Sequence, residues 1–334
     1  MIGTKQTSPI RKRILWVIKL CVTIGLGWFL VAHADLSAMG DTLVKMPLGL
    51  IIGACIFMLL SVTVSTYKWQ VLLKLHSVDF SFSKLHRYYF TALFFNNFLP
   101  SSIGGDGYRI YKTFGNPRSP SSSVIAVVME RLTGIVALLA IGYFCSFIVH
   151  VSHGDVVSEA LMSFGTTGIA ITLVAGLLFI VLQGYQRLMR WENKPMLLRI
   201  ILDHGKDYLR DPTATAKVML ISLYFHVHNS AGMYLLLRYG AGVDISIPEL
   251  FVVLTLVNLV GVLPISINGL GVVDVTFVVL LGAYGVDKDL ALSVMLVSRI
   301  LLILVSLVGA GFYLTERKDL PKEILSPALG ASRH

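Results

Sequence analysis

Two arginines lie deep inside apolar stretches of this sequence, where a charge is costly and marks a functional candidate. Arg131 and Arg299 each lie about nine residues into a long apolar run, or roughly 13 Å from a helix end at 1.5 Å per residue. A guanidinium group stays charged and binds phosphate oxygens in a bidentate manner. The pair predicts a phosphate site inside a membrane, with the alternative that Arg131 pairs with a carboxylate to hold the fold.

Three acidic residues accompany these arginines and are candidates for the same site. Asp106 and Asp274 each follow a glycine-rich segment, and Glu130 directly precedes Arg131. Neighbouring residues on a helix point about 100° apart, so Glu130 and Arg131 are expected to have different partners. The carboxylates either neutralise the arginines and accept backbone hydrogen bonds, or they carry a proton or receive a cationic headgroup.

The two glycine-rich segments, residues 99–105 and 263–269, share the pattern Leu-Pro-x-Ser-Ile-x-Gly. A proline ends the incoming helix and glycines let the chain reverse, while the freed backbone N–H groups can bind a phosphate. These tips therefore add hydroxyl, amide and backbone groups to the predicted substrate-binding set: Asn97, Ser102, Gly104, Gly105, Ser266, Asn268 and Gly269.

The composition places these residues in a membrane. Of the 334 residues, 55% are hydrophobic and 14% are charged, and the mean hydropathy is +0.76; a soluble protein is nearer to about one quarter charged. Apolar runs long enough to cross about 30 Å of hydrocarbon recur from end to end. The chain is thus predicted to be an all-α polytopic membrane protein. Six full spans are expected, at about residues 14–33, 47–67, 122–149, 160–183, 215–237 and 290–314.

Two further apolar stretches, residues 88–100 and 251–285, are too short or too interrupted to cross the membrane. The first has 13 residues, and the second breaks between Pro264 and Gly271. Each is predicted to be a re-entrant hairpin that returns to the face from which it enters. In this arrangement 22 of the 28 Lys and Arg residues lie on the cytoplasmic side, as the positive-inside rule favours. The protein is then a multi-pass protein of the cell inner membrane with both termini cytoplasmic.

The hairpins and the buried arginines predict an internal repeat. Each hairpin follows two spans and precedes a third span that contains a buried arginine, and the two hairpins enter from opposite faces. The halves, residues 1–155 and 156–334, are expected to be related by inversion. In transporters this arrangement places the site near the membrane midplane between the repeats.

The motifs resemble those of a known family, the lysylphosphatidylglycerol synthase transmembrane or flippase-like domain. They are Phe95-Asn96-Asn97-Phe98-Leu99-Pro100, Gly104-Gly105-Asp106 with Arg109, Glu130-Arg131, Leu263-Pro264 with Gly269-Leu270-Gly271, and Arg299. The resemblance covers nearly the whole chain and implies movement of a lipid between leaflets. In multiple peptide resistance factors this domain flips an aminoacylated phosphatidylglycerol made by an attached synthase domain. This sequence ends soon after Leu314, so synthase activity is not expected, and it has Asp274 where the family is expected to prefer Glu.

The favoured hypothesis is a flippase-like transporter that moves an anionic or phosphate-bearing lipid, either a phospholipid or a lipid-linked glycan. No P-loop is present, so ATP hydrolysis is not expected. The alternatives are an intramembrane enzyme, for which no catalytic residues stand out, and a scaffold for a lipid-modifying enzyme. A membrane lipid is the expected partner; no cofactor, metal or nucleic acid is expected, and the oligomeric state is left open.

Arg109 and Lys112 lie three residues apart beside Tyr108 and Tyr111. This pattern is typical of an interfacial patch that binds anionic headgroups.

His226 and His228 diverge by about 200° on a helix and are not expected to share a metal ion. His226 and Asn229 share a face, which predicts that they line a cavity or bond another helix.

Overall fold

A computed structural model gives the arrangement of the chain. It describes residues 20–21, 23–26, 28, 32, 36–98, 104–114, 120–153, 207–208, 210–263 and 266–318, and within these residues it contains helices and no β-strand. The elements are α2 (Leu36–Lys45), α3 (Leu48–Leu75), α4 (Phe82–Phe98), α5 (Gly104–Thr113), α6 (Pro120–His153), α9 (Pro212–Leu235), η1 (Leu236–Gly240), α10 (Ile247–Val262), η2 (Ile267–Gly269), α11 (Val272–Ala283) and α12 (Lys288–Lys318).

Three of the described helices are long and apolar enough to cross a membrane: Leu48–Leu75, Ser122–Val151 and Lys288–Glu316. They overlap three of the predicted spans, and α9 overlaps a fourth. The predicted span 160–183 lies outside the described residues, and the span 14–33 is described at only a few positions. The protein is therefore a membrane protein whose described part is all-helical, as its composition predicted.

The helix α3 continues two turns past its predicted end at residue 67. The sequence predicts that end because Lys68 interrupts the apolar run and resembles a loop charge. In the structure, Trp69, Leu72 and Leu73 are fully buried in a cluster that also contains Leu85 of α4. The burial of these side chains extends the helix beyond the point where its hydrophobic run is interrupted.

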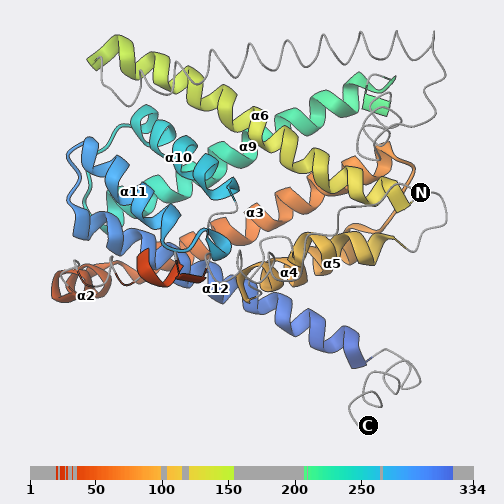
Figure 1. Ribbon diagram of the computed structural model, residues 1–334, viewed down its shortest axis with the longest axis horizontal. Helices are drawn as coiled ribbons and strands as arrows, with labels where there is room; N and C mark the ends of the chain where they lie inside the picture. The colour runs from red at the N-terminus through yellow and green to blue at the C-terminus, as the bar shows by residue number, and fades with distance from the viewer. Residues whose placement is uncertain are drawn as a thin grey trace.

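The long helices form the body of the molecule, and the short helix pairs flank it (Figure 1). α3 and α9 pack against each other. From N- to C-terminus, α3 and α12 run from left to right in this view, whereas α6 and α9 run from right to left. The pair α4–α5 lies toward the right of the view and the pair α10–α11 lies at the left. Within each predicted hairpin two short helices pack against each other, α4 with α5 in the first and α10 with α11 in the second.

Each hairpin packs against a long helix from the other half of the chain. α4 packs on α12, where a Cβ on Gly309 would lie 2.0 Å from the carbonyl oxygen of Phe90. α10 packs on α6, where a Cβ on Gly142 would lie 2.5 Å from the side chain of Thr255. Glycine is required at both crossings because no side chain fits between the two helices.

Two helices begin at polar caps near the ends of the bundle. The carboxylate of Asp211 accepts hydrogen bonds from the Thr213 hydroxyl and the Ala214 N–H, which lower the pKa of Asp211 and cap α9. α10 begins with a capping box between Ser246 and Glu249. Such caps satisfy N–H groups that an apolar helix start leaves without partners.

Candidate functional site

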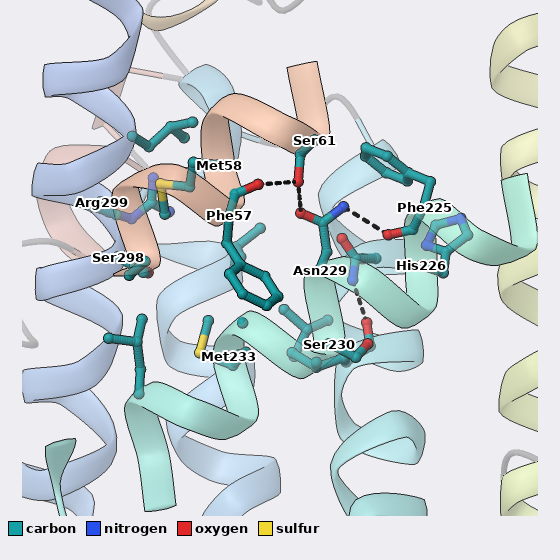
Figure 2. A pocket seen from close by; sticks show the side chains of 18 of the residues that line it. Phe57, Met58, Ser61, Phe225, His226, Asn229, Ser230, Met233, Ser298 and Arg299 are labelled. Atoms are coloured by element: carbon teal, nitrogen blue, oxygen red, sulfur yellow. Dashed lines mark hydrogen bonds between the residues drawn. The ribbon is translucent and has the colours of Figure 1, made fainter. Parts of the chain in front are cut away.

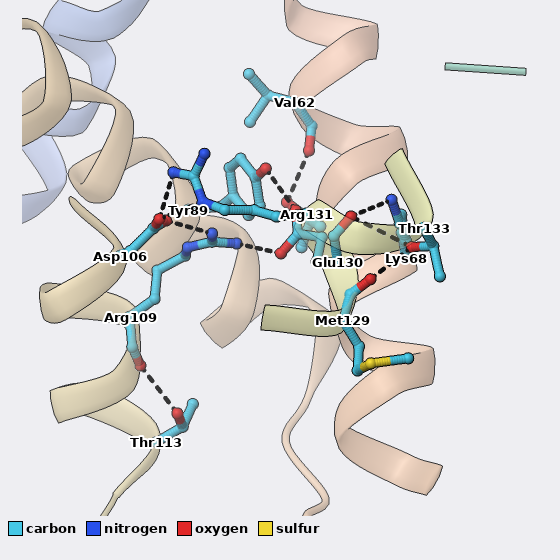
Figure 3. Close-up of polar contacts among 11 residues, drawn as sticks. Val62, Lys68, Tyr89, Asp106, Arg109, Thr113, Met129, Glu130, Arg131 and Thr133 are labelled. Carbon is cyan, nitrogen blue, oxygen red and sulfur yellow. Dashed lines mark hydrogen bonds and ion pairs between the residues drawn. The ribbon is translucent and has the colours of Figure 1, made fainter. Parts of the chain in front are cut away.

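A cluster of charged side chains joins α5 to α6 (Figure 3). Nη1 of Arg109 donates to Oε2 of Glu130 at 2.6 Å, and its Nη2 donates to Oδ1 of Asp106 at 2.6 Å. Nε of Arg131 donates to the other carboxylate oxygen of Asp106, also at 2.6 Å. One carboxylate of α5 therefore holds two guanidinium groups, and the neighbours Glu130 and Arg131 do have different partners.

A lysine and two aromatic rings enclose this cluster. Nζ of Lys68 donates to the backbone oxygen of Glu130 at 2.7 Å, and the hydroxyl of Tyr89 donates to Oε1 of Glu130 at 2.8 Å. The guanidinium carbon of Arg109 lies 4.5 Å from the ring centre of Tyr89 and 5.1 Å from that of Trp69. The cluster contains three basic side chains, Lys68, Arg109 and Arg131, and two carboxylates, Asp106 and Glu130. Such a concentration of charge is stable only because each group has a nearby partner.

A second ion pair joins α11 to α12. Nε of Arg299 donates to Oδ1 of Asp274 at 2.5 Å, while Oδ2 of Asp274 accepts the N–H of Gly271 at 2.8 Å and caps α11. Nη2 of Arg299 also lies 3.4 Å from the carbonyl oxygen of Gly269. Gly269 and Gly271 have φ values of +72° and +80°, which glycine adopts readily. Arg299 thus fastens the turn of the second hairpin to the following long helix.

The two ion pairs have the same spacing along the chain but different surroundings. In each pair the arginine follows the aspartate by 25 residues, from Asp106 to Arg131 and from Asp274 to Arg299. The side chain of Arg131 is 53% exposed, whereas that of Arg299 is 18% exposed. Asp106 binds a second guanidinium group, but the corresponding residue three positions after Asp274 is the buried Phe277. Arg131 is therefore the more accessible of the two arginines.

The two hairpins touch each other near their tips. Nδ2 of Asn268 in η2 donates to Oδ1 of Asn97 in α4 at 3.0 Å. Ser266 is half-buried in the second tip, and the predicted binding residue Ser102 lies outside the described residues. The contact between the two predicted amides joins segments that are 171 residues apart in the sequence.

The predicted binding glycines of the first tip have a packing role in the structure. Gly104 begins α5, and a Cβ on Gly105 would lie 2.1 Å from the backbone oxygen of Ala92. The N–H of Gly105 donates to Oδ1 of Asn96 at 2.9 Å. The backbone of α5 therefore lies directly against α4, and this N–H has a protein partner.

A cavity of about 500 Å³ lies between the two halves of the chain (Figure 2). Its walls come mainly from α3, α9, α10 and α12, and most of the lining is apolar. The lining residues with a polar group are Ser61, Ser65, Tyr89, His226, Asn229, Ser230, Thr255, Asn258, Asn268, Ser298 and Arg299.

Polar contacts across helices hold part of this lining in place. Oγ of Ser61 on α3 donates to Oδ1 of Asn229 on α9 at 2.9 Å. Nε2 of His226 is hydrogen-bonded to the backbone oxygen of Gly134 on α6 at 2.9 Å. The prediction that His226 and Asn229 line a cavity or bond another helix is confirmed, because each of them does both.

The structure divides the predicted binding residues between two places. Arg299 and Asn268 line the central cavity, whereas Arg131, Asp106 and Glu130 form the α5–α6 cluster and are not among the residues described as lining that cavity. Asp274 lies behind Arg299 as its partner. Among the described residues, no three His, Cys, Asp or Glu side chains are placed to hold a metal ion.

Two cavity features escaped prediction from the sequence. Asn258 is the only amide in the apolar run of residues 251–265, which is a signal that a search for polar residues in apolar helices would find. Ser61 and Ser65 lie four residues apart on α3 and therefore share one face. Small hydroxyl residues are common in apolar helices, so their spacing alone gave no functional prediction.

The interfacial patch predicted at Arg109 and Lys112 is wrong. Arg109 is 4% exposed and belongs to the charged cluster, and Nζ of Lys112 donates to Oε1 of Glu316 on α12 at 2.5 Å. The count of cytoplasmic loop charges needs the same correction, because Lys68 is a buried residue of α3. A charged residue next to a span is indistinguishable in sequence from a loop charge when its carboxylate partner comes from another helix.

A family model described as the lysylphosphatidylglycerol synthase TM region matches residues 16–309. A comparison with curated proteins gives no match. The matched range includes both hairpins, both Asp–Arg pairs and the central cavity.

Proposed function

The chain belongs to the family of the lysylphosphatidylglycerol synthase TM region, and from that premise we propose that it is a flippase-like transporter. Its cargo is an anionic or phosphate-bearing lipid, either a phospholipid or a lipid-linked glycan, which it moves between the leaflets of the cell inner membrane. It acts as a carrier rather than as an enzyme, with the lipid as its partner and without a cofactor.

The proposal is carried by one observation, the two arginines of apolar helices that each pair with an aspartate in the first turn of the preceding short helix. A guanidinium group has five N–H donors, and contact with one carboxylate leaves donors for phosphate oxygens. Arg131 is half-exposed and Arg299 lines the central cavity, so both are accessible to a headgroup. The phosphate passes between the two arginines, and each aspartate re-pairs with its arginine once the phosphate has left, because a bare buried charge is unfavourable.

The proposed topology has six full spans and two re-entrant hairpins, with both termini in the cytoplasm. Two observations support it. Most Lys and Arg residues lie on one side in this arrangement, even after Lys68 and Arg109 are removed from the loops. The described hairpin helices have 17, 10, 16 and 12 residues, and each is short for a full crossing of about 20 residues.

We further propose that the two halves, residues 1–155 and 156–334, are inverted repeats. The crossing of α4 with α12 has its counterpart in the crossing of α10 with α6. Asp106 and Asp274 are 168 residues apart, as are their arginine partners. Ser61 and Asn229, which bond to each other between α3 and α9, are also 168 residues apart. Equivalent positions therefore meet where a two-fold axis between the halves would lie.

Transport follows from rocking one repeat against the other around this axis. The headgroup occupies the polar cavity while its acyl chains remain in the surrounding lipid. Access then alternates between a cytoplasmic opening beside the first hairpin and an outward opening beside the second. Movement is downhill or coupled to an ion.

Reconstituted vesicles with an acyl-labelled phosphatidylglycerol test this proposal. Arg131→Gln and Arg299→Gln are each expected to slow label exchange between leaflets about tenfold or more, because a neutral amide holds a phosphate more weakly than a guanidinium group. Arg238→Gln is the matched control, since Arg238 pairs with the exposed Asp244 at the end of η1. Each variant is first checked for a folded peak by size exclusion.

Unchanged exchange in both folded variants would contradict the proposal and favour a scaffold for a lipid-modifying enzyme. Loss of folding in both variants, with exchange per folded molecule unchanged, would assign the arginines a purely structural role.

A further inference from the structure

The chemistry of the central cavity bears on which headgroup it accepts. Among the described residues its polar lining consists of hydroxyl groups, amides, one histidine and one guanidinium group, without a carboxylate. Figure 2 shows Ser298 and Arg299 on α12 facing the cavity from one side and His226 and Asn229 on α9 from the other. The part of the cavity next to Arg299 is thus suited to a phosphate, and the remaining polar lining is suited to neutral polar groups.

The amides of the lining are fixed but not saturated. Nδ2 of Asn258 donates to the backbone oxygen of Leu254 at 2.6 Å, and Nδ2 of Asn229 donates to that of Phe225 at 2.9 Å. Each of these bonds uses one of two N–H groups, and among the described residues the carbonyl oxygen of Asn258 has no hydrogen-bond partner. A hydroxyl group both donates and accepts, so it matches this mixture of N–H and C=O groups.

A cationic headgroup is disfavoured in the same place. An ammonium group donates hydrogen bonds, accepts none and needs a compensating charge once it leaves water. The carboxylate of Asp274 lies behind the lining residue Arg299, and it is already engaged by Arg299 and by the N–H of Gly271. The guanidinium group of Arg299 would also repel a second cation in the cavity.

We propose that this cavity selects a phosphate headgroup that carries neutral hydroxyl groups, such as a polyol or sugar phosphate, over one that carries an ammonium group. The inference rests on the proposed function and adds its substrate class. Arg299 holds the phosphate, and Asn229 and Asn258 bind the hydroxyl groups. A volume of about 500 Å³ holds one such headgroup and leaves the acyl chains outside.

Four acyl-labelled phospholipids in otherwise identical vesicles test the selection: phosphatidylinositol, phosphatidylglycerol, lysyl-phosphatidylglycerol and phosphatidylcholine. The first two are expected to exchange at least about tenfold faster than the last two, the ratio that about 1.4 kcal/mol of discrimination gives. Phosphatidylcholine is included because Phe57 and Phe225 line the cavity and aromatic rings attract quaternary ammonium groups. Equal or faster exchange of either lipid whose headgroup carries an ammonium group would overturn the inference while leaving the flippase proposal intact. Absence of exchange for all four lipids would instead contradict the flippase proposal.

Substitutions at Asn258 connect the selection to this cavity. Asn258→Leu is expected to reduce phosphatidylinositol exchange, and Asn258→Asp is expected to shift the preference toward lysyl-phosphatidylglycerol by supplying a carboxylate. Thr276→Val is the control, because Thr276 makes a similar bond to the backbone oxygen of Val272 but is not among the described lining residues. If folded Asn258→Leu and Asn258→Asp keep the original order of the four lipids, Asn258 does not contact the headgroup and the proposed site is wrong.

Discussion

At the scale of single residues, Asp274 combines two roles in one carboxylate. One oxygen caps α11 through Gly271 and the other holds Arg299. We predict that Arg299→Gln lowers the free energy of unfolding by about 3–5 kcal/mol, because it leaves a buried carboxylate without a cation. The double variant Asp274→Asn/Arg299→Gln should regain most of this stability, since Asn can still accept the Gly271 N–H and no charge remains. Thermal unfolding in detergent measures both.

The double variant also separates stability from function. It should fold well and still fail to move lipid, because no guanidinium group remains at that depth. Equal instability of the single and double variants would mean that the unpaired charge is not the cause.

The first cluster predicts a different order of effects. Arg109 is buried and binds both Asp106 and Glu130, whereas Arg131 is 53% exposed and leaves Asp106 with another partner when it is removed. We expect Arg109→Gln to lower the free energy of unfolding by about 3–5 kcal/mol and Arg131→Gln by about 1 kcal/mol or less. Denaturation of the two purified variants under the same conditions gives the comparison. A larger loss for Arg131→Gln would contradict the assigned burial.

At the scale of helices, the crossing of α4 and α12 depends on Gly309. A Cβ there would lie 2.0 Å from the backbone oxygen of Phe90, so Gly309→Ala should force the two helices apart. Overpacking of this kind typically lowers the free energy of unfolding by about 1–3 kcal/mol.

Gly311→Ala is the matched control for that prediction. Nothing lies within 4 Å of a Cβ at Gly311, and alanine is favoured over glycine in a helix by up to about 1 kcal/mol. Gly311→Ala should therefore leave stability unchanged or raise it. Thermal unfolding of Gly309→Ala and Gly311→Ala measures the difference between the two variants. Similar stability of the two variants would mean that α4 and α12 do not pack as described.

At the scale of the whole molecule, the topology predicts which positions can be labelled from outside the cell. In a background without Cys21, Cys55 and Cys145, a cysteine replacing Phe114 should be protected from an impermeant maleimide in intact cells. A cysteine replacing Tyr239 should react, because the end of η1 is proposed to face outward. Both side chains are well exposed, so burial does not limit labelling. Labelling of position 114 in intact cells would place the end of the first hairpin outside the cell and contradict the proposed topology.

The contact between the hairpins gives a second test at this scale. Asn268 and Asn97 bond to each other, and rocking of the halves should separate them. A chemical crosslink between cysteines at these two positions is expected to stop lipid exchange and to keep binding of a phosphorylated headgroup from one face. The same cysteines without crosslinker provide the control. Full exchange with the crosslink complete would favour a static groove over alternating access.

The sequence by itself determined the class of the protein and the approximate positions of the described apolar helices, while the two re-entrant hairpins stay a prediction. Apolar length and the interruptions after Pro100 and Pro264 carry this information locally, because membrane helices must satisfy their own backbone hydrogen bonds. Charges within or next to apolar runs are equally visible, so Arg131, Arg299, Asp106 and Asp274 could be singled out as a set. The helix ends were less accurate, since Lys68 looks like a loop charge although it lies within α3.

Only the tertiary structure decided which of these residues share a site. Arg131 and Arg299 lie at similar depth in the sequence pattern, yet Arg299 lines the central cavity while Arg131 belongs to a cluster with Arg109. Partner choice depends on the distances between helices that are far apart in the chain, and periodicity within one helix carries no record of them. For the same physical reason, only the structure shows that the amide of Asn258 on α10 lines the cavity.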